Sequence, residues 1–208
     1  MAVPSTLQKI IDRTLLNPLL QNLWMWSQFS PEKNLYFNGY VVKTPEGLVL
    51  IDPPLGDADL FEDIRSLGTP VLIYLTNRDH ERASAEFSQQ FNIPVAIHAL
   101  DAASTDTTLQ GGETLYDTIQ VIHIPNQKTP GETALYLKPQ QALLLGDALI
   151  GKNGTLAMMP AEKYENINAA RESLEVLLDI DGHIKAILVG DGDPILENAQ
   201  NTLVNFFS

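Results

Sequence analysis

Apolar residues in the first quarter of the chain alternate with polar ones or run continuously, and turn-forming residues such as Ser30, Pro31 and Gly47 interrupt them. Runs of Val, Ile, Tyr and Phe with this spacing are typical of β-strands. The pattern predicts an opening meander of three strands, at 23–29, 35–43 and 47–52.

From Asp57 onward, segments with helical spacing lie between short apolar runs. This part of the pattern predicts a helix, a strand, a helix and a strand, over 57–67, 70–76, 82–91 and 94–98. Strands that alternate with helices in this way favour a βαβ arrangement.

The second half of the chain repeats this order, because a β-rich part again precedes a βα part. Short strands are predicted at about 112–115, 118–124, 132–138 and 141–146, and a last strand at 184–189. An amphipathic helix over 162–180 would place Ile167, Ala170, Leu174, Leu177 and Leu178 on one face, and a final helix is predicted from about 193 to 207. Since no linker separates the halves, the pattern favours one domain over 1–208 with an internal pseudo-repeat.

Residues 1–22 have apolar positions at roughly helical spacing, but charged residues and Pro18 interrupt them well short of a secretory or membrane-spanning run. We expect this segment to form an N-terminal packing helix or an arm. Because we find no targeting signal, we expect the protein in the cytoplasm.

Composition excludes several classes of protein and site. The formal net charge of -13 and the pI near 4.5 would repel a phosphate backbone, so neither nucleic acid nor an anionic membrane is an expected partner. The chain has no cysteine, which excludes disulfides, thiolate zinc sites and a cysteine nucleophile. Any metal would therefore be held by His, carboxylate or water.

Five groups of residues, in order and at fitting distances, carry a family resemblance. They are the hairpin 37–43 and 48–52 ending in Ile51-Asp52, the segment 93–98 with Asp101, the segment 121–125 with Thr129-Pro130-Gly131-Glu132, the strand end Gly146-Asp147, and residues 188–192. From about residue 34 to 207 the chain resembles the metallo-beta-lactamase superfamily, particularly its small single-domain hydrolases related to glyoxalase II. The resemblance implies an α+β fold, a four-layer αβ/βα sandwich of two mixed sheets.

The family's activity depends on a His-x-His-x-Asp-His loop after a strand, because a divalent metal needs several converging imidazoles and carboxylates. This chain instead has Thr76-Asn77-Arg78-Asp79-His80. A register anchored on Thr76, which usually precedes the first His, puts Asn77, Asp79, Glu81 and Arg82 at the four functional positions. A register anchored on the next strand keeps Asp79 and His80 as the Asp-His pair and deletes two residues where His-x-His is usual. We prefer this second register.

In two-metal members of the family, the His-x-His pair and a middle His bind one ion, the Asp-His pair and a late His bind the other, and the Gly-Asp carboxylate bridges them. By this resemblance the first ion has lost its own ligands, and Lys128 stands where the middle His is usual. The second site keeps Asp79, His80, Asp147 and Asp191, the last in place of a His. This oxygen-rich set suits Mn²⁺, Fe²⁺ or Mg²⁺ better than a His-rich zinc site does.

The resemblance leads to two functional hypotheses. The first is a hydrolase of a small ester, thioester, lactone or phosphate with at most one divalent metal (Mn, Fe, Zn or Mg) at the second site and with Asp79 as ligand or catalytic base. The alternative is a metal-free, inactive pseudoenzyme in which Arg78, Arg82 and Lys128 balance the carboxylates or hold an anionic ligand or protein partner. The oligomeric state stays open, with a homodimer as one option.

Overall fold

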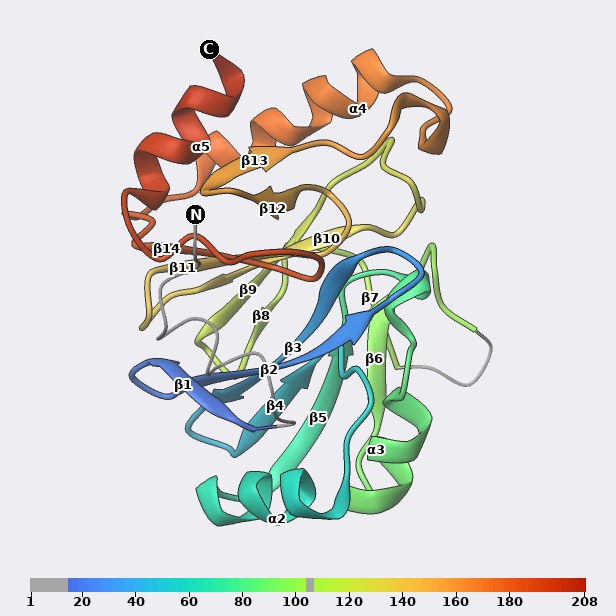
Figure 1. Ribbon diagram of the computed structural model, residues 1–208, viewed down its shortest axis with the longest axis vertical. Helices are drawn as coiled ribbons and strands as arrows, with labels where there is room; N and C mark the ends of the chain where they lie inside the picture. Colours follow the sequence, from blue (N-terminus) through green and yellow to red (C-terminus); the bar gives the residue numbers. More distant parts are fainter. Residues whose placement is uncertain (1–14, 104–106) are drawn as a thin grey trace.

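The computed structural model describes residues 15–103 and 107–208. Two mixed β-sheets lie face to face in the middle of the molecule, and helices cover the outer face of each sheet (Figure 1). The order of layers is helix, sheet, sheet, helix. The expected α+β fold, a four-layer αβ/βα sandwich, is thereby confirmed.

The first sheet has seven strands whose spatial order follows the chain. They are β1 (Asn17–Leu20), β2 (Leu23–Ser30), β3 (Leu35–Lys43), β4 (Leu48–Ile51), β5 (Pro70–Leu75), β6 (Val95–His98) and β7 (Thr107–Leu109). Strands β1 to β4 pair antiparallel, whereas β4 to β7 pair parallel. The helices α2 (Ala58–Leu67) and α3 (Ser84–Phe91) connect the parallel strands β4, β5 and β6, as the change of sequence pattern at Asp57 predicts.

The second sheet has five strands, and its order departs from the chain because β14 lies beside β11. The order is β14 (Ala186–Val189), β11 (Ala142–Leu145), β10 (Thr133–Leu137), β9 (Ile119–His123) and β8 (Thr114–Leu115), with only β14 and β11 parallel. A separate ribbon is formed by β12 (Ile150–Lys152) and β13 (Thr155–Ala157). The outer layer contains α4 (Ile167–Ser173) and α5 (Ala199–Phe207), with the 3₁₀ helices η2 (Ala161–Lys163) and η3 (Leu174–Asp179).

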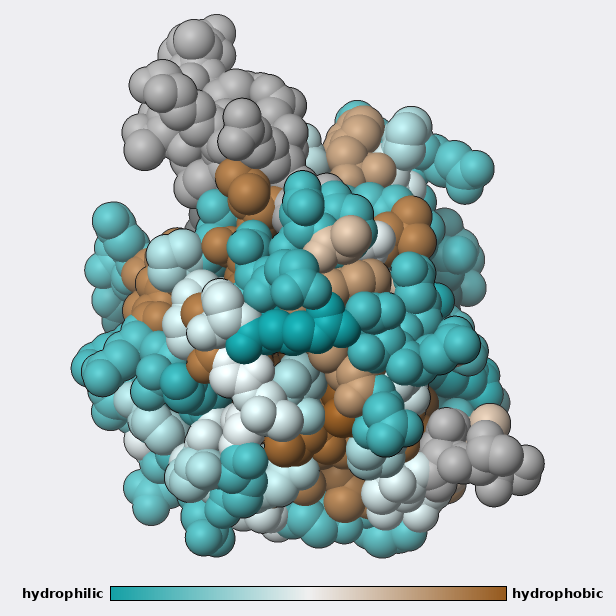
Figure 2. Space-filling model, turned by 90° about the horizontal axis from the view of Figure 1, so that it is seen from below, coloured by the Kyte–Doolittle hydropathy of each residue, from teal (hydrophilic) through white to brown (hydrophobic). Residues whose placement is uncertain are grey.

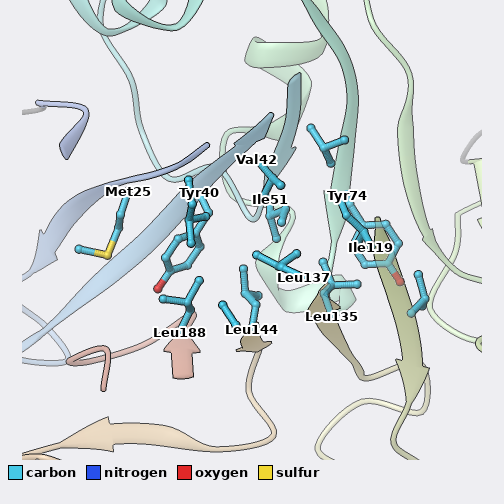
Figure 3. Packing of buried hydrophobic residues seen from close by; sticks show 14 of the residues in the cluster. Met25, Tyr40, Val42, Ile51, Tyr74, Ile119, Leu135, Leu137, Leu144 and Leu188 are labelled. Atoms are coloured by element: carbon cyan, nitrogen blue, oxygen red, sulfur yellow. The ribbon is translucent and has the colours of Figure 1, made fainter. Parts of the chain in front are cut away.

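Strand β4 shows how the sequence produces these layers. Val49 and Ile51 point into the core between the two sheets, whereas Leu48 and Leu50 point to the helical layer. Because successive side chains of a strand alternate between its faces, a strand covered on both sides is apolar throughout. Figure 3 shows the inter-sheet core, where side chains such as Tyr40 meet others such as Leu188 from the opposite sheet. Each fully buried side chain of this kind contributes roughly 1.5–3 kcal/mol.

The helix α2 illustrates the outer layer. Asp57 caps it by accepting a hydrogen bond from the Leu60 amide, and Leu60, Phe61 and Ile64 are buried. Seen from the side of α2 and α3, the surface is largely hydrophilic with small hydrophobic patches (Figure 2). No helix in the described ranges is long and apolar enough to cross a membrane.

Several boundaries differ from the sequence-based expectation. Residues 17–20, expected within a helix or arm, form the edge strand β1, while residues 1–14 lie outside the described ranges. The helix expected over 162–180 is broken into η2, α4 and η3. Because a 3₁₀ helix has three residues per turn, Leu174 and Leu177 share the buried face, and Leu178 is exposed.

The final helix begins at Ala199, not near residue 193. Ile195 instead exchanges two backbone hydrogen bonds with Ile187, and the Asp193 amide donates to the Gly151 carbonyl. Because these backbone groups form hydrogen bonds with neighbouring strands, they are not available for the hydrogen bonds of a helix.

Candidate functional site

Polar side chains gather at one edge of the sandwich because strand ends of both sheets meet there. Asp52 follows β4 and Thr76 follows β5, two parallel strands in register. Asp147 follows β11 and Asp191 lies just beyond β14, again two parallel strands. Carboxyl ends of parallel strands share an edge, so residues far apart in the sequence become neighbours. The short helix η1 (Arg78–His80) adds Asp79 and His80.

His80 lies at the centre of this group and is 3% exposed. Its Nδ1 lies 2.8 Å from Oδ2 of Asp52, and its Nε2 lies 3.2 Å from Oδ1 of Asp147. Burial lowers the pKa of His80, but the carboxylates of Asp52 and Asp147 outweigh burial and raise that pKa to about 10. At neutral pH His80 is therefore an imidazolium that donates from both ring nitrogens.

Lys128 forms the second cationic contact, from the loop between β9 and β10. Its ammonium nitrogen lies 2.7 Å from Oδ2 of Asp79 and 2.6 Å from Oδ2 of Asp147. Burial lowers the pKa of Lys128, and the two carboxylates outweigh burial and raise that pKa above its ordinary value. Burial acts to raise the pKa of Asp147, but His80 and Lys128 hold that pKa below its usual range. Asp147 is thus a buried carboxylate with one cation on each oxygen.

Arg82 forms the third cationic contact. Its guanidinium donates to Oδ1 of Asp191 at 2.8 Å and to the carbonyl oxygens of Asn38, Asp52 and Gly190. It also lies over the ring of Phe37, 4.7 Å from the centroid. Burial raises the pKa of Asp191, although His80 and Arg82 partly offset that effect.

The fully buried Glu132 supports the turn that carries Asp147. Its Oε1 accepts hydrogen bonds from the backbone amides of Asp147 and Ala148, while Oε2 has no partner among the described residues. Burial and the nearby Asp147 carboxylate raise the pKa of Glu132 well above its ordinary value. The neutral carboxylic acid is therefore favoured, and in this form Glu132 adds no further negative charge to the site.

Two adjoining pockets open onto this cluster. The smaller has a volume of about 100 Å³ and is lined by Lys33, Phe37, Asp79, His80, Arg82, Lys128, Asp147 and Asp191. The larger, about 440 Å³, shares Lys33 and Asp191 with it and continues along Tyr36, Ile150, Gly151 and Lys152. The larger pocket lies between the loop that precedes β3 and β12 of the β12–β13 ribbon, and the two adjoining pockets are together called the cleft.

Comparisons with known proteins place this arrangement in a family. The family model described as the metallo-beta-lactamase superfamily matches residues 16–207. The chain belongs to the metallo-beta-lactamase superfamily. Members of this superfamily are generally metal-dependent hydrolases. No curated protein matches the sequence.

Solved structures of metallo-beta-lactamase proteins share the fold at low sequence identity. A metallo-beta-lactamase from Pontibacter korlensis is 16% identical, with 93% of this chain and 97% of that chain covered and a TM-score of 0.77. One from Hirschia baltica is 12% identical, with coverage of 92% and 94% and a TM-score of 0.69. The protein TTHA1623, solved in a di-iron-bound form, is 24% identical, with coverage of 81% and 93% and a TM-score of 0.63.

The structure brings most of the expected site residues of this metallo-beta-lactamase-type domain together. His80, Asp147 and Asp191 place ligand atoms within 4.8 Å of one another, while Asp79 points to Lys128. Arg78 does not face this cluster, because its side chain lines a separate cavity. Asn77 caps η1 by accepting from the Asp79 amide, and its buried Nδ2 has no partner among the described residues.

The contacts can be compared with the two registers of the metal-binding loop. The register anchored on Thr76 puts Asp79 among the ligands of the first ion and Arg82 among those of the second. In the structure Asp79 contacts Lys128, at the middle-His position, and Arg82 contacts Asp191, at the late-His position. The register anchored downstream keeps His80 as a ligand, and His80 does lie beside Asp147. Both registers therefore describe some of the contacts.

Sequence reasoning gave no role to Asp52 or Glu132, although both stand in motifs of the superfamily. Asp52 binds the Thr76 amide and hydroxyl as well as His80, and so fixes the loop that follows β5. The sequence feature that could have indicated a role for Asp52 is its position directly after the apolar run of β4. A carboxylate at the end of a buried strand needs partners, and the loop supplies them.

The donor set fits a metal ion poorly. A protonated imidazole has no lone pair for a metal, and Nε2 of His80, the ring nitrogen that Asp52 leaves free, lies against the Asp147 carboxylate. Lys128 holds Oδ2 of Asp147, and Arg82 holds Oδ1 of Asp191. A metal would have to remove the His80 proton and compete with cations that the chain itself provides.

Proposed function

We propose that this protein binds a small anionic molecule in the cleft formed by the two adjoining pockets, without a metal ion. The observation that carries the proposal is the position of Lys128, whose ammonium bridges the carboxylates of Asp79 and Asp147. A fixed organic cation there supplies the positive charge that a metal would supply in a hydrolase of this family.

The charges around the cleft support an anionic ligand. Four cationic groups line the smaller pocket, Lys33, His80, Arg82 and Lys128, against three carboxylates, Asp79, Asp147 and Asp191. Lys33 forms no ion pair within the described ranges, and its ammonium lies 5.0 Å from the centre of the Phe37 ring. Lys33 lines both pockets, so it is the cation best placed to meet a ligand's anionic group.

Metal analysis of protein purified without chelators tests the metal-free part of this proposal. After supply of Mn²⁺, Fe²⁺ or Zn²⁺ we expect well below one metal ion per chain, with no difference between the parent, Asp147→Asn and the surface control Asp63→Asn. One ion per chain in the parent and in Asp63→Asn, absent from Asp147→Asn, would overturn it.

Titration with inorganic phosphate, followed by amide chemical shifts, tests the binding part. We expect saturable shifts around Phe37 and Gly192, weakened about tenfold by Lys33→Gln because one charge-assisted contact is lost. Lys163→Gln, which alters an exposed lysine of η2, serves as the matched control. Equal affinity of the Lys33→Gln and Lys163→Gln variants would count against the cleft as the binding site.

A second candidate is a hydrolase of a small ester, thioester, lactone or phosphate with one divalent metal at His80, Asp147 and Asp191. The contact between Asp52 and Nδ1 of His80 favours it, because histidines that bind metals commonly donate their other ring N–H to a carboxylate. The metal analysis separates the two candidates, since only the hydrolase requires an ion that Asp147→Asn removes.

A further inference from the structure

The chain contains two Asn-Gly sequences, Asn38-Gly39 and Asn153-Gly154. An asparagine that precedes glycine is especially prone to deamidation, because glycine has no side chain to hinder the attack of its own backbone nitrogen on the asparagine amide. The two sequences lie in different surroundings. Asn38-Gly39 lies inside strand β3, whereas Asn153-Gly154 forms the turn between β12 and β13.

Asn153 and Gly154 form an exposed two-residue turn, with Lys152 and Thr155 paired on either side of it. Their φ angles of 52° and 76° are both positive, as a type I′ hairpin turn requires. Within the described ranges, no hydrogen bond holds the Asn153 side chain or the Gly154 amide. A Cβ added at Gly154 would meet no atom within 4 Å, so neighbouring groups leave the turn room to move.

Asn38-Gly39 has the same sequence but is tightly held. Asn38 is 1% exposed, its Oδ1 accepts from the Ser27 hydroxyl, and its Nδ2 donates to two backbone carbonyls near the end of β14. A Cβ at Gly39 would collide with Pro54 and Trp26. Deamidation requires the asparagine side chain and the next backbone nitrogen to approach each other, and this packing opposes that movement.

We infer that Asn153 is a site of spontaneous deamidation in the folded protein, and that the fold protects Asn38. The Gly154 amide nitrogen, after losing its proton to a base in solution, attacks Cγ of Asn153 and closes a succinimide ring. The bond between Cγ and Nδ2 breaks, and ammonia leaves with a proton from water. Water then opens the ring at one of its two carbonyl groups, which yields aspartate or isoaspartate.

Either product changes the wall of the cleft. Lys152, which directly precedes Asn153, lines the larger pocket, so the new carboxylate adds a negative charge next to a cationic residue of that wall. Isoaspartate also lengthens the backbone by one atom, so the turn no longer matches the pairing of Lys152 with Thr155. The reaction needs no ligand in the cleft, so it can occur whether or not the cleft binds an anion.

Peptide mass spectrometry of the full chain, incubated in mildly alkaline buffer at physiological temperature, tests this inference. Trypsin releases the two sites in separate peptides, 34–43 and 153–163, because a lysine precedes and ends each of them. A sample unfolded in guanidinium chloride sets the incubation time, since both sites are open in it and should convert at similar rates. Over the same time in the folded protein, Asn153 should convert at least about tenfold more than Asn38, because buried segments open rarely.

Two controls keep the result interpretable. Samples taken before incubation are digested in parallel, so that conversion during digestion can be subtracted. Asn153→Gln should show no conversion at this position, because the longer side chain would have to close a larger ring, and it should leave Asn38 unchanged. The inference is overturned if Asn153 stays unmodified in the folded protein while it converts in the unfolded sample, or if both sites convert equally in the folded protein.

Discussion

The ammonium group of Lys128 lies 2.6 Å from the carboxylate of Asp147, on the oxygen that does not face His80. Asp147 is 2% exposed, so solvent contributes little to stabilising its negative charge. The two cations therefore determine whether this carboxylate can remain ionised inside the protein.

Lys128→Met should destabilise the fold by about 2–3 kcal/mol, because it leaves the Asp147 carboxylate with one cation in place of two. The expected loss is smaller than for a fully buried pair, since the Lys128 side chain is 21% exposed. Urea unfolding at pH 7 measures the free energy of unfolding. The exposed Lys163→Met is the matched control, and an equal effect of both substitutions would contradict the role given to Lys128.

Arg82→Lys should cost roughly 2 kcal/mol even though it conserves charge, because an ammonium cannot reproduce the planar fork of a guanidinium. The guanidinium donates to Asp191 and to the carbonyls of Asn38, Asp52 and Gly190. A double-mutant cycle of Arg82→Gln with Asp191→Asn would measure their coupling in free energy of unfolding. Additive effects of the two substitutions would show that the ion pair contributes nothing.

Stability should decline as pH rises above neutrality, because His80 is held in its charged form. Its pKa in the folded protein is about 10, above the ordinary value of 6.5. A raised pKa contributes stability that is complete below pH 6.5 and is lost as pH rises through 10, by at most on the order of 5 kcal/mol. A pH series of urea unfolding measures this loss, and NMR titration of the imidazole follows His80 directly. Titration of His80 near pH 6.5 would show that the imidazolium is not stabilised.

Glu132→Gln should change the free energy of unfolding by less than about 1 kcal/mol, whereas Glu132→Ala should cost roughly 2–3 kcal/mol. The raised pKa of Glu132 favours a neutral side chain, which glutamine imitates, and its carbonyl oxygen can still accept from the Asp147 and Ala148 amides. Thermal and urea unfolding of both variants measure these changes in the free energy of unfolding. A large cost for Glu132→Gln would mean that Glu132 is ionised or that its hydroxyl has a partner.

The layers of the fold could be predicted because local patterns determine them. The apolar run of β4 and the capped helix α2 can be recognised without knowledge of distant residues. The segment 193–197 could not be predicted in the same way. Its backbone groups bind Ile187 and Gly151, and such contacts exist only once the strands have come together.

The functional site, too, could be predicted only in part from the sequence. Its carboxylates could be found, since Asp147 and Asp191 stand at strand ends in ordered motifs. Which cation pairs with which carboxylate could not be predicted from the sequence, because the pairing depends on the direction in which each side chain points. Arg78 and Arg82 are four residues apart and chemically alike, yet Arg82 meets Asp191 and Arg78 faces a different cavity.

Asn38 connects the two halves of the sandwich next to this site. It belongs to β3 of the first sheet, and its Nδ2 donates to the carbonyls of Val189 and Gly192 at the end of β14 in the second sheet. The hydroxyl of Tyr40 donates to the same Val189 carbonyl. Either half of the sandwich, expressed alone, would leave these groups unpaired as well as exposing its inner apolar face. We therefore expect each half to be an unfolded fragment and the whole chain to melt in a single transition.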